Sequence, residues 1–315
     1  MHICPTGLGS LRGEMKKRRI SRNDNAVSGV VEALLLVALV AMILATIQLV
    51  YIPPIMEDKE NAHMDEVEKQ FSYLKSTIDI QSMTKEKILM SSPITLGSKE
   101  LPYFVTMGAT GQINLLDEND VGDCKLKVLP APTFNPLKTE FDNGIPLTSI
   151  KYGASNSYIE DYNYILEGGG LIDQTPSENM IVKPSIIVEN NTNDIVIHYN
   201  LPFFTSVPGK KSDVCGYGNA DKTVFIRTNY STFYTSSSND ITKLQIFTNY
   251  PDAWNESLIG DNGLLTEYYQ NGYINVVRYD SQNPPLIEIL PASKNIDLEI
   301  DVVQIRVQIG AGIVK

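Results

Sequence analysis

The sequence predicts an α+β protein with an N-terminal transmembrane helix, a juxtamembrane amphipathic helix and a β-rich, sandwich-like domain outside the membrane. Three observations support this fold class. An uncharged apolar run covers 33–56, a helical stripe of apolar residues follows it, and short β-like runs separated by Gly, Pro and Asn fill the remainder. We expect four segments: a cytoplasmic basic leader (1–26), the membrane helix (27–56), an amphipathic helical segment (57–92) and an extracytoplasmic β-rich domain (93–315).

The apolar segment from Val27 to Ile52 is long enough to cross a membrane, because a hydrocarbon core about 30 Å thick needs roughly 20 helical residues. Its N-terminal flank at 16–22 reads KKRRISR, whereas the opposite flank is mainly acidic. Lys and Arg are enriched on the cytoplasmic side of membrane helices, so the leader is predicted inside and the large domain outside. The run is too long for an ordinary secretory signal, and no A-x-A site ends it.

The charge is distributed unevenly along the chain. The formal net charge is -11, but the residues from Glu57 onward hold 20 basic and 34 acidic groups, a net charge of -14. A domain this acidic is repelled by nucleic-acid phosphates and by anionic lipid. We therefore expect the chain to meet the membrane through its helix, and we expect no nucleic-acid partner.

The start of the apolar run carries a family resemblance. Residues 25–33 read NAVSGVVEA and are followed by LLLVALVAMILA. This pattern resembles the N-terminus of archaeal type IV pilins and related archaeal surface proteins. The resemblance implies that a prepilin peptidase-like membrane enzyme removes the leader between Ala26 and Val27. It also implies that the remaining helix packs with its neighbours in a homo- or hetero-polymer.

Glu32 stands inside the apolar run, where a carboxylate is costly in lipid. One interpretation places it near the interface, where it reaches water. The other has its charge neutralised in assembly by a partner, such as the amino terminus of a neighbouring subunit. Glu32 would be the sixth residue of the mature chain, whereas the comparable acid of bacterial pilins is the fifth. Met15 heads the basic leader, so translation can begin at Met1 or at Met15.

The resemblance implies a membrane-anchored, pilin-like structural or adhesion protein at the cell surface. The alternative is a solitary membrane-anchored binding module, for sugars or a surface layer, that is not processed as a pilin. An anchored enzyme is the least favoured class, because the sequence contains no G-x-S-x-G, H-E-x-x-H or Walker motif. We expect no catalytic residue, metal or cofactor, and we expect the acidic run 117–123 to form a turn, since its spacing does not match a calcium loop.

Pro53 and Pro54 are predicted to stop or kink the helix after the membrane. Beyond them, apolar residues recur every three or four positions in one stripe: Met64, Val67, Phe71, Leu74 and Ile78. The stripe is typical of a helix packed on its own domain. A coiled-coil stalk is the other interpretation, although two heptads are short for it.

Beyond Pro93, we expect strands within ten short runs and one long alternating run: 102–107, 112–116, 125–129, 162–166, 185–189, 195–201, 224–228, 244–248, 273–279, 287–290 and 296–309. The alternation of the last run changes phase near Val303, which predicts a bulge. Residues 189–194 are predicted to form a hairpin tip. Gly168 and its two neighbouring glycines indicate a tight turn that needs positive φ, and Trp254 is expected to anchor a short helix on the core.

Two cysteines lie in the large domain, and two interpretations remain open. Cys124 and Cys215 either form one disulfide or remain buried free thiols. Three N-x-S/T triplets become acceptors for N-glycosylation if the domain is outside the membrane, at Asn190, Asn229 and Asn255.

Overall fold

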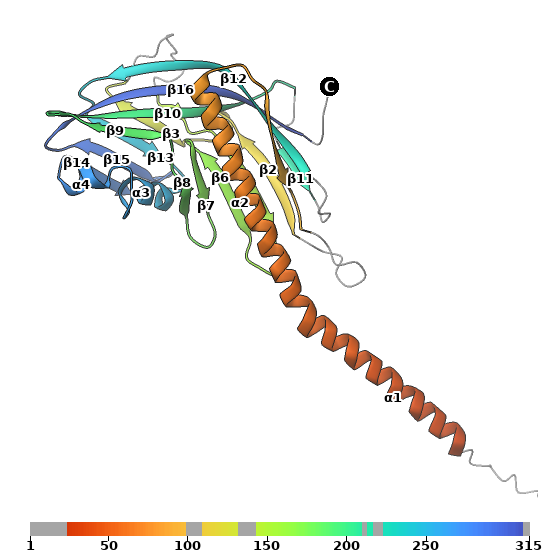
Figure 1. Cartoon of the computed structure of the whole chain (residues 1–315). Helices are drawn as coiled ribbons and strands as arrows, with labels where there is room; N and C mark the ends of the chain where they lie inside the picture. Colours follow the sequence, from red (N-terminus) through yellow and green to blue (C-terminus); the bar gives the residue numbers. More distant parts are fainter. Residues whose placement is uncertain (1–23, 99–108, 132–142, 210–212, 217–222, 311–315) are drawn as a thin grey trace, which may run out of the picture. The chain divides into compact units, whose positions relative to one another are not determined.

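The computed structural model describes residues 24–98, 109–131, 143–209, 213–216 and 223–310. This part of the chain is α+β: one long apolar N-terminal helix precedes a strand-rich region of three sheets (Figure 1). It divides into two compact units, and the division falls between Tyr51 and Ile52. The strand expected over 102–107 lies outside the described residues.

The first unit contains helix α1 (Asp24–Thr46) and a π-helical turn, η1 (Ile47–Tyr51). Helical residues continue into the second unit as α2 (Ile52–Thr84), so Pro53 and Pro54 do not stop the helix, and the alternative, a kink, stays a prediction. A proline ring clashes with the carbonyl four residues earlier. The carbonyls concerned belong to η1, a π-helical turn whose hydrogen bonds differ from those of a regular α-helix.

Three sheets make up the second unit together with α2, α3 (Pro251–Ile259) and α4 (Thr266–Gln270). The first sheet has the order β1 (Met90–Thr95), β12 (Thr223–Ser238), β16 (Asn295–Gly310), β10 (Asp194–Ser206), β9 (Ile186–Asn190). The second has the order β11 (Asp213–Gly216), β2 (Thr110–Leu116), β5 (Ser149–Ser155), β6 (Tyr162–Glu167), β7 (Gly170–Asp173), β8 (Asn179–Val182). The third has the order β14 (Ile274–Tyr279), β15 (Leu286–Pro291), β13 (Lys243–Phe247), β3 (Lys125–Leu129), β4 (Ile145–Pro146).

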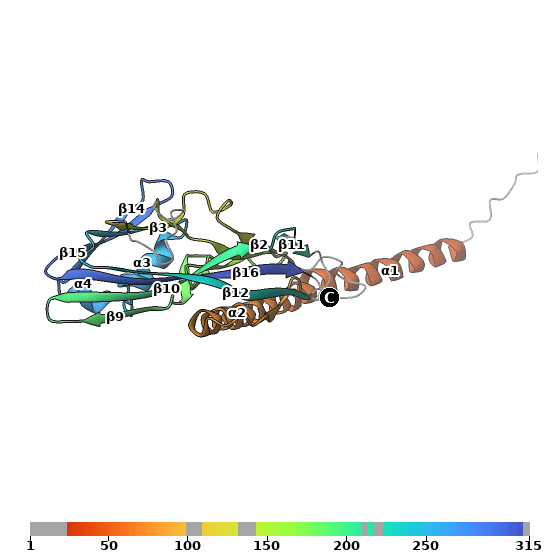
Figure 2. The same cartoon turned by 90° about the horizontal axis from the view of Figure 1, so that it is seen from above.

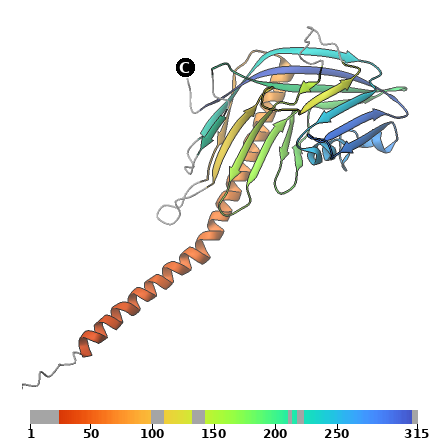
Figure 3. The ribbon, with the colours of Figure 1, turned by 180° about the vertical axis from the view of Figure 1, so that it is seen from behind.

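The apolar stripe of α2 is buried within its own domain, as the packed-helix interpretation predicts. Every stripe residue from Met64 to Ile78 is at most 2 % exposed, and α2 contacts β1, β6, β7, β10 and β12. Figure 3 shows α2 running behind the sheets. The helix ends at Thr84, earlier than the expected 92. Lys85 adopts the left-handed conformation, with φ of 52°, and turns the chain toward β1.

Polar side chains of α2 also hold it on the domain. The Glu60 carboxylate, fully buried, accepts backbone N–H bonds from Ser157, Tyr158 and Ile159 at 2.8–3.1 Å. Nε2 of His63 lies 3.2 Å from the Tyr152 hydroxyl. A carboxylate bound by three N–H groups is well satisfied in the interior, so Glu60 fixes the β5–β6 loop against the helix.

The first sheet serves two hydrophobic cores, one on each face. Along β16 the buried residues are even-numbered up to Val302 and odd-numbered from Val303 to Ile309. Because side chains alternate across a sheet, this change of parity moves the buried face from one side to the other. The first half packs with the third sheet and α3, and the second half packs with α2 and the second sheet.

The predicted phase change near Val303 is therefore present, but the bulge is on another strand. Strands β10 and β16 lie side by side (Figure 2), and their parallel pairing has no register shift. The shift occurs in the pairing of β12 with β16, between Tyr230 and Thr232. The extra residue there lets β12 keep even-numbered side chains buried on both sides of the switch.

Three local predictions concern the β6–β7 turn, the β9–β10 hairpin tip and the short helix α3. Gly168 and Gly169 have φ of 58° and 79° and form the two-residue connection between β6 and β7, which confirms the need for positive φ. The predicted hairpin tip joins β9 to β10, where the Asn191 N–H donates to the Asp194 carbonyl. Trp254 is fully buried on α3, as expected.

Candidate functional site

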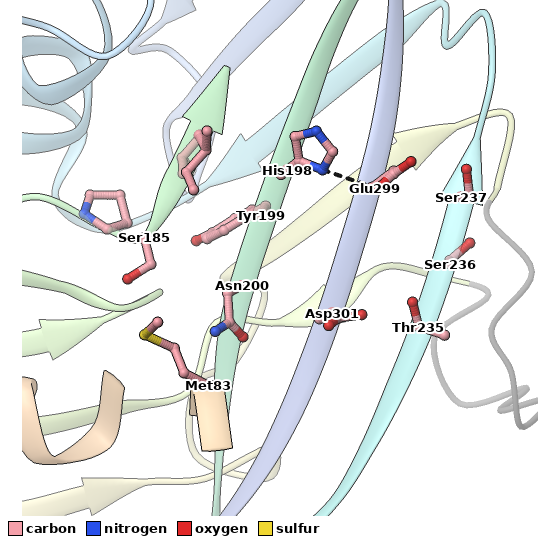
Figure 4. A pocket seen from close by; sticks show the side chains of 13 residues that line it. Met83, Ser185, His198, Tyr199, Asn200, Thr235, Ser236, Ser237, Glu299 and Asp301 are labelled. Carbon is pink, nitrogen blue, oxygen red and sulfur yellow. Dashed lines mark ion pairs between the residues drawn. The ribbon is translucent and has the colours of Figure 1, made fainter. Parts of the chain in front are cut away.

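A groove lies on the first sheet beyond the C-terminal end of α2 and encloses about 590 Å³ (Figure 4). Its floor is the sheet face that α2 covers further along, because His198, Asn200, Glu299 and Asp301 alternate with buried neighbours that point to the opposite core. Volumes of this size are typical of small-molecule sites. The groove lies wholly within the second unit, on strands β9, β10, β12 and β16.

The floor consists of two cross-strand rows, each with a hydroxyl, a carboxylate and a nitrogen-bearing side chain. One row runs Ser237, Glu299, His198 across β12, β16 and β10, and the other runs Thr235, Asp301, Asn200. In the first row, Nδ1 of His198 lies 3.0 Å from Oε2 of Glu299 (Figure 4). In the second, Nζ of Lys85 lies 2.7 Å from Oδ2 of Asp301.

The rows do not assemble a nucleophile and base. Ser237 stands across β16 from His198, with Glu299 between them, so the hydroxyl and the imidazole are two strand spacings apart, roughly 9–10 Å. A serine activated by histidine needs hydrogen-bond contact of about 3 Å. The arrangement suits binding through hydrogen bonds rather than nucleophilic attack.

The apolar α1 segment is the second functional feature. Within the first unit, side chains from Gly29 to Val50 are exposed apart from Ile47, which is half-buried. One helix in the described part of the chain is long and apolar enough to span a membrane. Glu32 points outward from α1 with an exposed side chain, and Ala26 and Val27 lie in the first turns of this helix.

The cysteines and the sequons differ in their surroundings. Cys124 is a free, buried thiol, and burial raises its pKa to about 11, so of the two interpretations the free thiol holds for Cys124. Cys215 pairs through its backbone with Gln112, and its side chain lies outside the described part. Among the three sequon asparagines only Asn190, at the end of β9, is exposed; Asn229 lies half-buried in β12 and Asn255 half-buried in α3. Asn190 is therefore the acceptor we expect to be used.

A buried carboxylate, missed by the sequence analysis, joins the β6–β7 turn to α3. Oε1 of Glu167 accepts hydrogen bonds from Thr248 Oγ1 at 2.7 Å and from Trp254 Nε1 at 3.0 Å. The Tyr199 hydroxyl donates to the Gly168 carbonyl at 2.7 Å. Burial raises the pKa of Glu167 to about 7, against the opposing effect of these two hydrogen bonds. The cluster is structural, and it makes stability sensitive to pH.

We expect the Glu167 carboxyl to weaken folding as the pH rises from about 4.5 to 7. Its pKa is about 7 when folded and 4.5 as a model value, so in this window the folded state holds the proton more tightly and the free energy of unfolding falls with pH. A shift of this size corresponds to about 3 kcal/mol once the pH exceeds 7. Urea unfolding followed by fluorescence of Trp254, the single tryptophan, measures it.

The matched variant is Glu167→Gln, whose amide oxygen can accept both hydrogen bonds but cannot titrate. Burial lowers the pKa of His63 to about 4, so His63 contributes the opposite slope between pH 4 and 6.5. The readout is therefore the difference between variant and wild type at each pH. The free energy of unfolding of the variant should rise relative to that of the wild type as the pH increases to 8. A difference that stays constant with pH would contradict the raised pKa of Glu167.

No family model, curated protein or solved structure matched this chain in the three comparisons. The proposed function therefore rests on the sequence, the fold and the geometry of the groove.

Proposed function

We propose that this chain is a membrane-anchored, pilin-like structural or adhesion protein whose sandwich-like, β-rich domain lies outside the cell. One observation carries the proposal: helical residues run from Asp24 to Thr84, exposing apolar side chains in α1 and burying an apolar stripe on the β-domain in α2. A helix that is apolar around its whole circumference needs lipid or other helices to cover it. The α2 half supplies the attachment to the globular domain.

The charge distribution supports the orientation. Six basic side chains precede the apolar run at residues 12–22, and the region from Glu57 onward carries the acidic excess. By the positive-inside rule this places the leader in the cytoplasm and the β-domain outside. Exposure of the domain at the cell surface also gives access to the modification enzymes that Asn190 would require.

Polymerisation requires loss of the leader. A helix that packs against apolar neighbours cannot keep Lys16 to Arg22 attached, because those charges would be buried without partners. A cut between Ala26 and Val27 by a prepilin peptidase-like enzyme removes them and leaves a new amino group. The rise from Val27 to Glu32 is roughly 7.5 Å, so Glu32 pairs with the amino terminus of a neighbouring subunit rather than with its own.

We expect mass spectrometry of the chain isolated from its membrane fraction to find a mature N-terminus at Val27, within a residue. Bulky substitution at the cut, Ala26→Trp, should leave the leader attached, whereas Ala33→Trp, beyond the cut, should be processed normally. Finding residues 16–22 still attached to the wild-type chain would exclude processing as a pilin.

The second candidate, a solitary anchored binding module, is favoured by the groove on the first sheet. It needs the apolar helix as an anchor but needs neither leader removal nor polymerisation. The mature N-terminus separates the two candidates, because only the pilin-like protein loses its leader. Both candidates are non-enzymatic and need no cofactor.

A further inference from the structure

The two polar rows of the groove present a set of hydrogen-bonding groups across three strands, β12, β16 and β10, roughly 9–10 Å wide. In each row a hydroxyl stands beside a carboxylate and then an imidazole or amide. Oδ1 of Asn200 is buried and has no hydrogen-bond partner, and Nε2 of His198 makes no hydrogen bond, its nearest carboxylate oxygen being 3.9 Å away on Glu189. A buried acceptor without a partner costs free energy, and a hydrogen-bond donor on a ligand would remove that cost at Asn200.

The carboxylates of the two rows already have partners within the protein. Asp301 is paired with Lys85, and Glu299 has His198 at hydrogen-bond distance. An anion would meet the two carboxylates and Glu189, while a strongly charged cation would compete with Lys85 for Asp301. Among the described residues, no group of three or more His, Cys, Asp or Glu is arranged to hold a metal ion. The groove therefore suits neutral ligands rich in hydroxyl donors.

One wall of the groove is apolar and partly exposed. It consists of Met83 at the end of α2, Pro184, and Ile186 and Ile187 of β9. Met83 is 76 % exposed and Ile187 is 66 % exposed, whereas Ile186 is half-buried and Pro184 is buried. Apolar side chains of this size at the edge of a polar floor provide contact area for the C–H groups of a ligand whose other edge forms hydrogen bonds.

We propose that this groove binds a neutral carbohydrate. Sugar rings carry hydroxyl groups, which can donate to the carboxylate and amide oxygens of the floor. They also carry C–H groups, which can pack on the apolar side chains of the wall. In this assignment Asn200 Oδ1 and the free oxygens of Glu299 and Asp301 accept sugar hydroxyls, and Thr235 and Ser237 donate. The inference gives a ligand class to the adhesion part of the proposed function, on which it rests, and holds whether or not the helix polymerises.

The test uses the full chain in a polyoxyethylene detergent, because detergents with sugar headgroups would compete for the groove. An array of neutral oligosaccharides of glucose, galactose, mannose and N-acetylhexosamines, with sialylated and uronic acid members for comparison, identifies the bound glycan. Titration calorimetry with the strongest binder then compares variants. We expect Asn200→Ala and Thr235→Val each to raise Kd tenfold or more, while Asn275→Ala, an exposed asparagine on β14, leaves Kd unchanged.

Asn200→Ala removes an oxygen that makes no hydrogen bond, so the variant should fold with an unchanged thermal midpoint. Thr235→Val keeps the side-chain shape at an exposed position, which provides an independent folded variant. No binding to any neutral glycan, stronger binding to acidic glycans, or binding that both variants leave intact would each overturn the proposal. A negative array leaves the mature N-terminus unaffected, so the failure of this inference is distinguishable from failure of the pilin-like assignment.

Discussion

Deleting residues 27–52 should move the chain completely from the membrane fraction to the soluble fraction. Each Leu, Ile or Val near the centre of a membrane helix contributes about 0.3–0.6 kcal/mol to insertion, so this run contributes several kcal/mol in total. The domain that remains carries the acidic excess and buries its own cores, which keeps it soluble. Fractionation by ultracentrifugation, with immunodetection of the β-domain, measures the change.

The matched control replaces 27–52 by an alternating Leu-Ala run of the same length. This control keeps the length of the apolar run but loses the residues that resemble archaeal type IV pilins. It should therefore stay in the membrane fraction, and its leader should no longer be cut after Ala26. Added protease should digest the β-domain of the wild-type chain in intact cells. A deletion variant that remains in the membrane fraction would show that another part of the chain makes the attachment.

The helical half of the fold was predictable because it depends on local periodicity. The side chains of the apolar run are exposed and the stripe from Met64 to Ile78 is buried, as the composition of each segment predicts. The helix does not stop at Pro53, and a π-helical turn directly precedes the two prolines; no residue type specifies that turn in advance. The buried Glu60 also escaped prediction, since its partners are backbone N–H groups nearly 100 residues away.

The sequence predicted the positions of the strands better than it predicted their lengths or their pairing partners. The run 224–228 marks only part of β12 (Thr223–Ser238), whose later half is rich in Thr and Ser and lacks the expected apolar alternation. Its polar side chains face the groove because the bulge after Tyr230 changes which face is buried. Such a change follows from packing against two cores, which a local pattern does not contain.

The groove also depends on strand pairing that a local sequence pattern does not contain. The alternation of Asp297, Glu299 and Asp301 with apolar neighbours indicates a strand with one acidic face. It does not predict that β10 lies parallel beside it and places His198 and Asn200 in the same two rows. The parallel pairing joins residues about 100 positions apart, so only the tertiary fold brings the hydroxyls, carboxylates and amide together.

Phe71→Ala should lower the free energy of unfolding of the β-domain by about 3–5 kcal/mol. The Phe71 ring is fully buried between α2 and the second sheet, and it packs edge-to-face against Tyr152, with the ring centroids 6.0 Å apart. Its truncation removes apolar contact, leaves a cavity and ends an aromatic pair that contributes about 1 kcal/mol beyond its buried area. Urea unfolding of the full chain in detergent, followed by Trp254 fluorescence, reports the loss at a distant point of the domain.

Tyr73→Ala provides the matched control, because Tyr73 lies two residues further along α2 and is 58 % exposed. A surface substitution of this kind should change the free energy of unfolding by no more than about 0.5 kcal/mol. Equal losses in the two variants would mean that the stripe does not pack on its own domain. If α2 formed a coiled-coil stalk instead, Phe71→Ala would change the oligomeric state and leave the unfolding of the β-domain unaltered. A large loss confined to Phe71 therefore supports the attachment that the proposed function requires, with α2 holding the β-domain to the membrane helix.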